Sequence, residues 1–174
     1  SIVRSFSSAN ITGTYYCGGI AGYSGPNSII TNWFSTGSVT GTNYAGGLVG
    51  GIDSGTISNC YSSGAVSGSS SNGLAGGTNS TVLNSFWDVS VYATSKYGTG
   101  KTSAELQDIA TFSGAGWDIV SGYDIGHVWN ITGALNSGYP YLSWSVRAKT
   151  YFVDDTATGA NNGSSWTDAF TSLQ

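Results

Sequence analysis

An internal repeat of 25 to 28 residues fills the first half of the chain and constrains the fold more than any other feature. Each copy holds short apolar pieces separated by glycine, serine and asparagine, a pattern typical of strands and turns. The period is shorter than the roughly 40 residues of a propeller blade, and the spacing is not helical. Four sets of apolar residues recur at equivalent positions: Ile2, Ile30, Ile57 and Val82; Phe6, Phe34, Tyr61 and Phe86; Ile11, Val39 and Val66; and Ile20, Leu48 and Leu74.

Strands this short cannot bury an apolar face alone, but they can when successive coils stack about 4.8 Å apart. Each recurring set then becomes a column of similar side chains along the stack. Asn32, Asn59 and Asn84 also recur, and we expect their amides to hydrogen-bond in a ladder. The repeat therefore predicts a mostly β chain in which residues 1–90 form a parallel β-solenoid of about three coils.

The composition agrees with coils that turn sharply and stack on one another. Glycine accounts for 27 of the 174 residues, and it supplies the positive φ angles that tight corners need. Charged residues make up only 8% of the chain, as expected where like charges would otherwise lie one above the next. Five Lys and Arg residues are too few to neutralise a nucleic-acid backbone, and no run of eighteen apolar residues is present. We therefore expect neither nucleic-acid binding nor membrane insertion by this segment.

The middle copy of the repeat carries the most specific motif. It reads Gly-Gly-Leu-Val-Gly at residues 46–50, followed by Gly-Thr-Ile-Ser-Asn-Cys-Tyr-Ser-Ser-Gly-Ala-Val-Ser-Gly at residues 55–68. This segment resembles the GLUG repeat, which occurs in large secreted bacterial surface proteins, including adhesins. The resemblance extends over about residues 1–90. It implies a β-solenoid that serves as a stalk or display surface, located outside the cell or on its surface, with no shared catalytic residue.

Residues 91–149 lose the period and are predicted to form a cap. One short helix is expected near residues 103–113, because Thr102 and Glu105 form a capping box before an apolar pattern of helical spacing that ends at Gly114. Short strands or aromatic loops are expected around Trp117, Trp129 and Tyr141. A solenoid exposes apolar side chains and unpaired backbone groups at its last coil, so we expect this segment to cover that end.

Residues 150–174 change character again, with a strand-like segment at 150–155 and a helix-like segment at 164–174. They resemble the N-terminal strand and helix of a pectate-lyase-like parallel β-helix. The chain stops where such a domain would begin, so we expect either a fragment of a longer protein or a tail that links subunits. In the second case, the strand near Tyr151 would add to the open edge of the first coil in another copy, giving head-to-tail filaments.

Few residues in the sequence suggest chemistry. Cys17 and Cys60 fall at different phases of the repeat, which favours two buried thiols over a disulfide, although the pairing stays open. His127 is the only histidine, and no nucleophile elbow or zinc spacing accompanies it. We therefore expect no catalytic residue and no cofactor.

Two weak binding candidates remain. Tyr139, Tyr141 and Trp144 could stack on sugar rings if they are exposed, or fill a core if they are not. The carboxylates that a calcium ion would use are those of Asp154, Asp155 and Asp168, but they match no calcium-binding loop, so we expect no metal site.

The sequence therefore favours a non-enzymatic, extracellular structural or adhesive segment whose partners are copies of itself, other surface proteins or glycans. The alternative is a carbohydrate-binding or polysaccharide-active module. The scarcity of ionisable residues in the repeat favours the first interpretation, because catalysis needs acids and bases with tuned pKa values.

Overall fold

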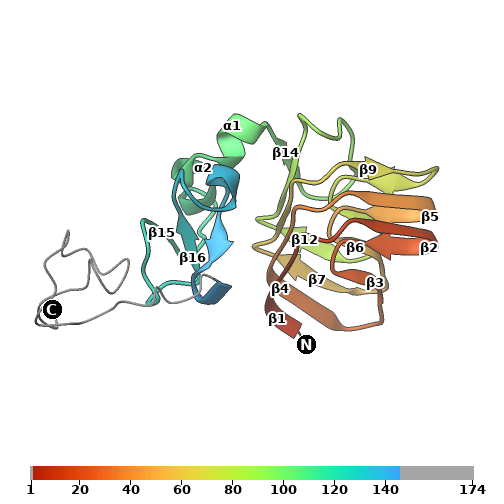
Figure 1. Cartoon of the computed structure of the whole chain (residues 1–174). Coiled ribbons are helices and arrows are strands. Elements are labelled where there is room, and N and C mark those ends of the chain that lie inside the picture. The colour runs from red at the N-terminus through yellow and green to blue at the C-terminus, as the bar shows by residue number, and fades with distance from the viewer. Residues whose placement is uncertain (1, 146–174) are drawn as a thin grey trace, which may run out of the picture. The chain divides into compact units, whose positions relative to one another are not determined.

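The computed structural model describes residues 2–145, and strands that follow the repeat wind into a parallel β-solenoid (Figure 1). The first coil contains β1 (Ile2–Ser7), β2 (Ile11–Gly18) and β3 (Ala21–Ser24), and the second contains β4 (Ser28–Ser35), β5 (Val39–Gly46) and β6 (Val49–Ile52). The third coil contains β7 (Gly55–Ser58), β8 (Tyr61–Ser62), β9 (Val66–Ser67), β10 (Ser71–Asn72) and β11 (Ala75–Thr78). A partial fourth coil contains β12 (Thr81–Leu83) and β13 (Phe86–Asp88), and β14 (Thr99–Lys101) follows a loop.

Equivalent strands of successive coils pair in parallel and form three sheets. Sheet 1 contains β1, β4, β7, β8, β12, β13 and β14; sheet 2 contains β2, β5, β9 and β10; and sheet 3 contains β3, β6 and β11. The mostly β fold class and the parallel solenoid of about three coils that the repeat predicts are confirmed.

The strands pair in the register that the alignment of copies predicts. In sheet 1, Ile30 lies opposite Ile2 and Ile57, and Phe34 lies opposite Phe6 and Tyr61. Val82 and Phe86 extend these two columns, and Ile11, Val39 and Val66 form a column in sheet 2. Ile20, Leu48 and Leu74 are joined by backbone hydrogen bonds from one coil to the next.

The recurring asparagines have a backbone role that the sequence analysis did not anticipate. Asn32, Asn59 and Asn84 have φ angles of 59°, 52° and 46°, and Arg4, at the equivalent place in β1, has 55°. Asparagine adopts this left-handed conformation more readily than other non-glycine residues. The expected amide ladder is thus replaced by a bend that recurs in sheet 1, and the Asn32 Oδ1 accepts a hydrogen bond from Trp129 Nε1 at 3.1 Å.

The bend decides which side chains enter the solenoid. Ile30 and Trp33 both belong to the interior cluster, together with Leu48, Ile57 and Leu74. Strict alternation along β4 would place Ile30 and Phe34 on the same face. The left-handed residue between them shifts the alternation by one, so Trp33 points inward and Phe34 points outward.

A loop after β13 covers the last coil. Trp87 Nε1 donates to the Tyr92 carbonyl at 3.1 Å, Tyr92 Oη donates to the Ser71 carbonyl at 3.0 Å, and the Lys96 amide donates to Asn72 Oδ1 at 2.8 Å. β14 then pairs with β13 and adds a further rung to sheet 1. Residues 89–101 therefore close the end of the solenoid.

The rest of the predicted cap packs on the side of the solenoid. Its elements are α1 (Ser103–Leu106), α2 (Ile109–Ser113), β15 (Ile119–Ser121), β16 (Trp129–Ile131), a 3₁₀ turn (Asn136–Gly138), β17 (Tyr141–Leu142) and a 3₁₀ turn (Ser143–Ser145). The capping box of Thr102 and Glu105 is present, but the expected single helix is two helices. The first ends at Leu106, and the Asp108 side chain caps the second by accepting from the Ala110 amide at 2.9 Å.

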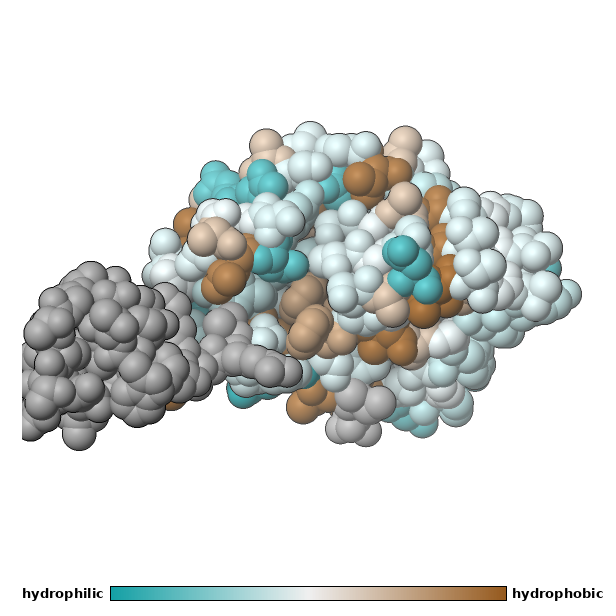
Figure 2. Space-filling view, in the orientation of Figure 1, coloured by the Kyte–Doolittle hydropathy of each residue, from teal (hydrophilic) through white to brown (hydrophobic). Residues whose placement is uncertain are grey.

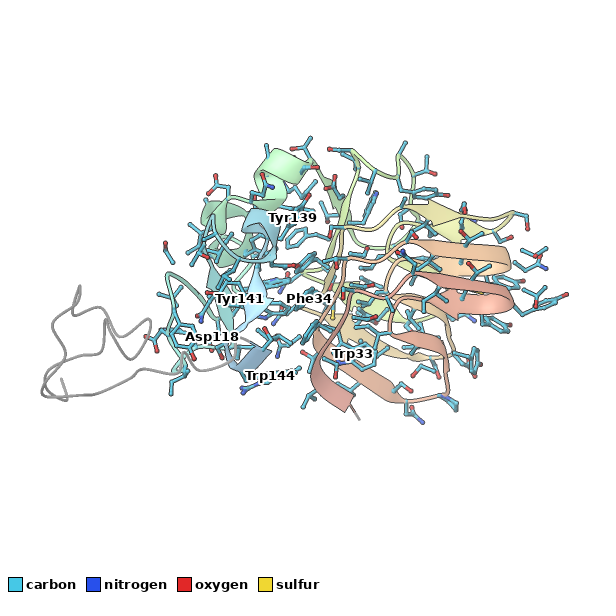
Figure 3. All side chains as sticks on the ribbon, viewed as in Figure 1. Trp33, Phe34, Asp118, Tyr139, Tyr141 and Trp144 are labelled. Carbon is cyan, nitrogen blue, oxygen red and sulfur yellow. The ribbon has the colours of Figure 1, made fainter. Side chains whose placement is uncertain are left out.

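The aromatic column of Phe34, Tyr61 and Phe86, which points outward from sheet 1, explains why the cap packs on the side of the solenoid. Phe34 and Tyr61 stack with ring centroids 5.2 Å apart, and Trp129 lies 5.8 Å from Phe34 and 6.1 Å from Tyr61. Phe112 and Trp117 contact Phe86 and Tyr61 in the same way. Figure 3 shows Phe34 at the border between the solenoid and the cap. The expectation that residues 91–149 cover the open end is wrong for most of that segment, because the apolar surface needing cover lies on the flank.

The solenoid and the cap belong to one compact unit that ends at Ser143, and a second unit, of which only Trp144 and Ser145 are described, follows. The expected tail of residues 150–174 lies outside the described residues. Within residues 2–145, no helix has the length and apolar character needed to cross a membrane.

Candidate ligand-binding groove

The aromatic residues proposed from sequence as a sugar platform lie in different environments. Tyr141 is 2% exposed, and Tyr139 is half-buried with its ring stacked on Tyr61 at 6.2 Å. Trp144 is 54% exposed. Figure 3 shows Tyr139 and Tyr141 within the cap. The structure therefore uses the two tyrosines for packing.

Asp88 joins the cap to the solenoid through a buried hydrogen-bond network. Ser103 Oγ and Tyr139 Oη each donate to Asp88 Oδ2 at 2.7 Å, and the Ser90 amide donates to Oδ1 at 2.8 Å. Burial of this carboxyl raises its pKa, but the hydrogen bonds from Ser103, Tyr139 and Ser90 outweigh burial, so the pKa lies below its ordinary value of 3.8. The group is a structural carboxylate, since each oxygen is held by the protein.

The lowered pKa of Asp88 predicts acid sensitivity. A carboxyl whose folded-state pKa is depressed contributes stability above its unfolded pKa, and that contribution is lost as the pH falls from about 4 through the folded value. Urea denaturation at pH 6 and pH 3 should show a larger loss for the wild type than for Asp88→Asn. Tyr139→Phe, which removes one donor, should fall between them. Equal pH dependence in all three would contradict this role for Asp88.

His127 and Asp118 form the other notable polar pair, on the cap surface. Nδ1 of His127 lies 2.6 Å from Oδ1 of Asp118, and Asp118 Oδ2 accepts from the Val128 amide at 3.0 Å. The hydrogen bond between the side chains raises the pKa of His127 and lowers that of Asp118. Both side chains are exposed, and their hydrogen bonds within the described residues join them to each other and to the Val128 amide, so this pair stabilises a loop in our interpretation.

The cysteines are free thiols buried in separate clusters, Cys17 with Val39, Ala45 and Val66 of sheet 2 and Cys60 in the interior cluster. Burial raises the pKa of Cys60 to about 12, so it stays a neutral thiol at physiological pH. Among residues 2–145, no group of three or more His, Cys, Asp or Glu side chains is placed to hold a metal ion. The weak calcium candidates Asp154, Asp155 and Asp168 lie outside the described residues.

A cluster of exposed tyrosines marks a surface that sequence reasoning missed. Tyr16 of β2 and Tyr44 of β5 are stacked, with centroids 5.1 Å apart and planes 12° from parallel, and Tyr23 of β3 meets Tyr16 edge-on at 5.0 Å. All three are exposed, at 39%, 40% and 53%. Tyr16 and Tyr44 have φ angles of 47° and 51°. Such backbone is costly for a bulky residue and is maintained only where the surrounding structure enforces it.

Glycines form the floor beneath these rings. A Cβ on Gly51 would come within 2.7 Å of the Tyr16 ring, and one on Gly77 within 3.1 Å of the Tyr44 ring. Gly51 and Gly77 are paired neighbours in sheet 3. The tyrosines of sheet 2 therefore lie against a glycine strip on sheet 3, where any side chain would displace them.

The tyrosines border two hollows that share lining residues, and we call the two together the tyrosine groove. One, of about 360 Å³, is lined by Tyr16, Tyr23, Tyr44, Gly51, Ile52, Asp53, Gly77, Asn79 and Tyr97. The other, of about 580 Å³, is lined by Tyr44, Gly68–Asn72, Gly76, Gly77, Tyr92 and Thr94–Tyr97. Tyr44, Gly77 and Tyr97 border both. Both volumes fall in the range of roughly 300–1,000 Å³ that is usual for small-molecule sites.

The tyrosine groove is aromatic, hydroxyl-rich and nearly uncharged. Asp53 and Lys96 are the charged residues among those that line it, and the other polar side chains are tyrosines, serines, a threonine and two asparagines. On the face of the molecule visible in Figure 2, pale colours of intermediate hydropathy predominate and teal patches are small. One sequence signal was available: Tyr16 and Tyr44 are separated by 28 residues, like Phe6 and Phe34.

Comparison with known proteins identifies the repeat. Residues 41–67 match the family model named Glug, described as the GLUG motif. The matched segment starts in β5 and ends with β9, so it corresponds to one full turn of the solenoid. Residues 41–67 therefore form a GLUG-type turn within the parallel β-helix region. No curated protein and no solved structure gives a significant match.

Proposed function

Starting from a GLUG-repeat β-solenoid, we propose that this chain is a non-enzymatic, extracellular structural and adhesive segment of a bacterial surface protein. The observation that carries the proposal is that the large side chains of the solenoid serve to pack its coils together and to hold the cap. Apolar residues fill the columns inside the coils, and aromatic residues join the outer face of sheet 1 to the cap. The result is a scaffold that holds an exposed polar surface in a fixed shape.

The placement of ionisable groups supports a role without chemistry. Glycoside hydrolysis needs two carboxyl groups facing each other across a sugar-binding groove. Asp53 is the acidic residue that borders the tyrosine groove, and Asp88 is buried beneath the cap. The alternative of a polysaccharide-active module therefore has less support than a binding or structural role.

Surface display tests this proposal. A non-adherent bacterium that displays residues 1–174 through an unrelated anchor should attach to coated surfaces under flow several-fold more than the same cell displaying the anchor alone. Incubation of the purified chain with polysaccharides should release no new reducing ends. Attachment equal to that of the anchor alone, or steady release of reducing ends, would contradict the proposal.

A further inference from the structure

The aromatic stack of the tyrosine groove has a ring in the first coil, Tyr16, and in the second, Tyr44, but none in the third. Pairing between the second and third coils starts with an offset of 27, at Val39 and Val66, and ends with an offset of 26, at Ala45 and Ser71. The third coil has therefore lost one residue between these pairs. Ser70 alone stands where the second coil has Asn43 and Tyr44, so no third ring continues the stack of Tyr16 and Tyr44.

The larger hollow occupies this place. One face of the Tyr44 ring stacks on Tyr16, and Tyr44 also borders the hollow, together with the exposed serines 69 and 70. The loop after β13 forms the opposite wall with Tyr92 and Tyr97. Because Tyr92 Oη lies 2.8 Å from Ser71 Oγ and donates to the Ser71 carbonyl, this wall is held in position.

A flat, ring-shaped group of amphipathic character fits the place of the missing rung. Aromatic rings carry negative charge on their faces, which attracts the weakly positive C–H groups of a pyranose. The rim of such a sugar presents hydroxyls, which the hydroxyls and amide groups of residues 68–72 and 94–97 can match. Lys96 and Asp53 are the charged side chains that line the two hollows, one of each sign, so the groove offers no net charge to an acidic sugar.

We propose that the tyrosine groove binds neutral polysaccharide chains, with one hexose or N-acetylhexosamine ring stacked on the free face of Tyr44 and the chain continuing toward Tyr23. Tyr44 lines both hollows, so a linear oligomer with one ring stacked on Tyr44 can extend from one hollow toward the other. This inference deepens the proposed adhesive function and rests on it. It also places sugar recognition on the solenoid, at residues distinct from Tyr139, Tyr141 and Trp144.

A proline-rich peptide is the other ligand that aromatic grooves commonly take. Such peptides bind between aromatic side chains that stand side by side with their faces open. Here Tyr16 and Tyr44 cover each other, which leaves a single ring face at the hollow. The geometry therefore favours one stacked sugar over a polyproline helix.

Affinity electrophoresis of the full chain in gels containing β-1,3-glucan, β-1,4-glucan, mannan or glycol chitin tests the proposal, with polygalacturonate and a proline-rich peptide as comparators. We expect retardation by at least one neutral polymer and at least tenfold weaker binding for Tyr44→Ala. Tyr15→Ala removes a tyrosine that is 67% exposed on the same sheet and does not line the groove, so it should bind like the wild type.

Ser70→Tyr provides a second test that does not depend on removing a ring. An added tyrosine at this position should occupy the hollow and abolish binding, while the urea midpoint stays at or above that of the wild type. Absence of retardation by every neutral polymer, unchanged binding by Tyr44→Ala and Ser70→Tyr, or binding only to polygalacturonate or the peptide would overturn the proposal. If the chain bound no polysaccharide but displayed cells still adhered, sugar binding by the groove would be contradicted and the adhesive function would be supported. If the chain bound polysaccharide but displayed cells did not adhere, the adhesive function would be contradicted and sugar binding would be supported.

Discussion

Gly50→Ala is expected to cost more than 4 kcal/mol of unfolding free energy, or to prevent folding altogether, which is among the largest effects a single methyl group can have. Gly50 lies in β6 of the second coil, where its backbone is close to backbone atoms of the first coil. A Cβ at this position would overlap the Tyr16 carbonyl carbon and approach Cys17 N at 2.5 Å and Gly22 O at 2.6 Å. These are backbone atoms inside the stack, so neither a rotamer change nor a local shift can relieve the clash.

The control for Gly50→Ala is Gly25→Ala in the same part of the solenoid. An added Cβ at Gly25 would meet nothing within 4 Å. Where the native backbone accepts alanine, this change stabilises a protein by about 0.4–1 kcal/mol through the unfolded state. Urea denaturation followed by circular dichroism should separate the two variants, and a Gly50→Ala midpoint equal to that of the wild type would show that the coils pack less closely than described.

Tyr61→Ala should cost about 3–5 kcal/mol, because it removes the central ring of the seam between sheet 1 and the cap. Tyr61 is 0% exposed, and its ring contacts Phe34, Phe112, Trp117 and Trp129. No smaller residue can fill a site bounded by so many rings. The near-ultraviolet circular dichroism of the cap tryptophans should weaken together with the urea midpoint.

Two further variants separate the ring of Tyr61 from its hydroxyl. Tyr61 Oη donates to the Pro140 carbonyl at 2.6 Å and accepts from Asn136 Nδ2 at 2.7 Å, so Tyr61→Phe should cost about 1–3 kcal/mol by leaving these groups unpaired. Tyr123→Ala, at a cap residue that is 55% exposed, should stay within about 0.5 kcal/mol of the wild type. A Tyr61→Ala midpoint close to that of Tyr123→Ala would mean that the cap does not pack on the aromatic column.

Column membership could be predicted from the sequence because a parallel in-register stack converts a repeat directly into spatial neighbours. The alignment placed Phe34 opposite Tyr61 without any knowledge of the coil path, and the structure pairs them. Whether the side chains of a column point into or out of the solenoid could not be predicted in the same way. It depends on the left-handed φ of Asn32, which shifts the alternation along β4 and turns Phe34 outward.

Neither the position of the cap nor the candidate site was predicted from the sequence, because the recurring residues were interpreted only as core residues. An aromatic column assumed to be internal gives no reason for a cap on the flank, so the open end seemed the surface to cover. Tyr16 and Tyr44 were overlooked because the search for columns followed apolar core residues, whereas these tyrosines stack on the outside over glycines of a neighbouring sheet. The gap above Tyr44 depends on a one-residue change of register, which only the paired strands reveal.

The direct test of stacked coils is a nuclear Overhauser map of the backbone. Parallel in-register pairing predicts contacts between the backbone protons of Ile30 and Ile57, and of Val39 and Val66, residues 27 positions apart. The same pattern should recur in all three sheets. Contacts of antiparallel type between strands adjacent in sequence, such as β4 with β5, in place of these long-range pairs would contradict the solenoid and everything inferred from it.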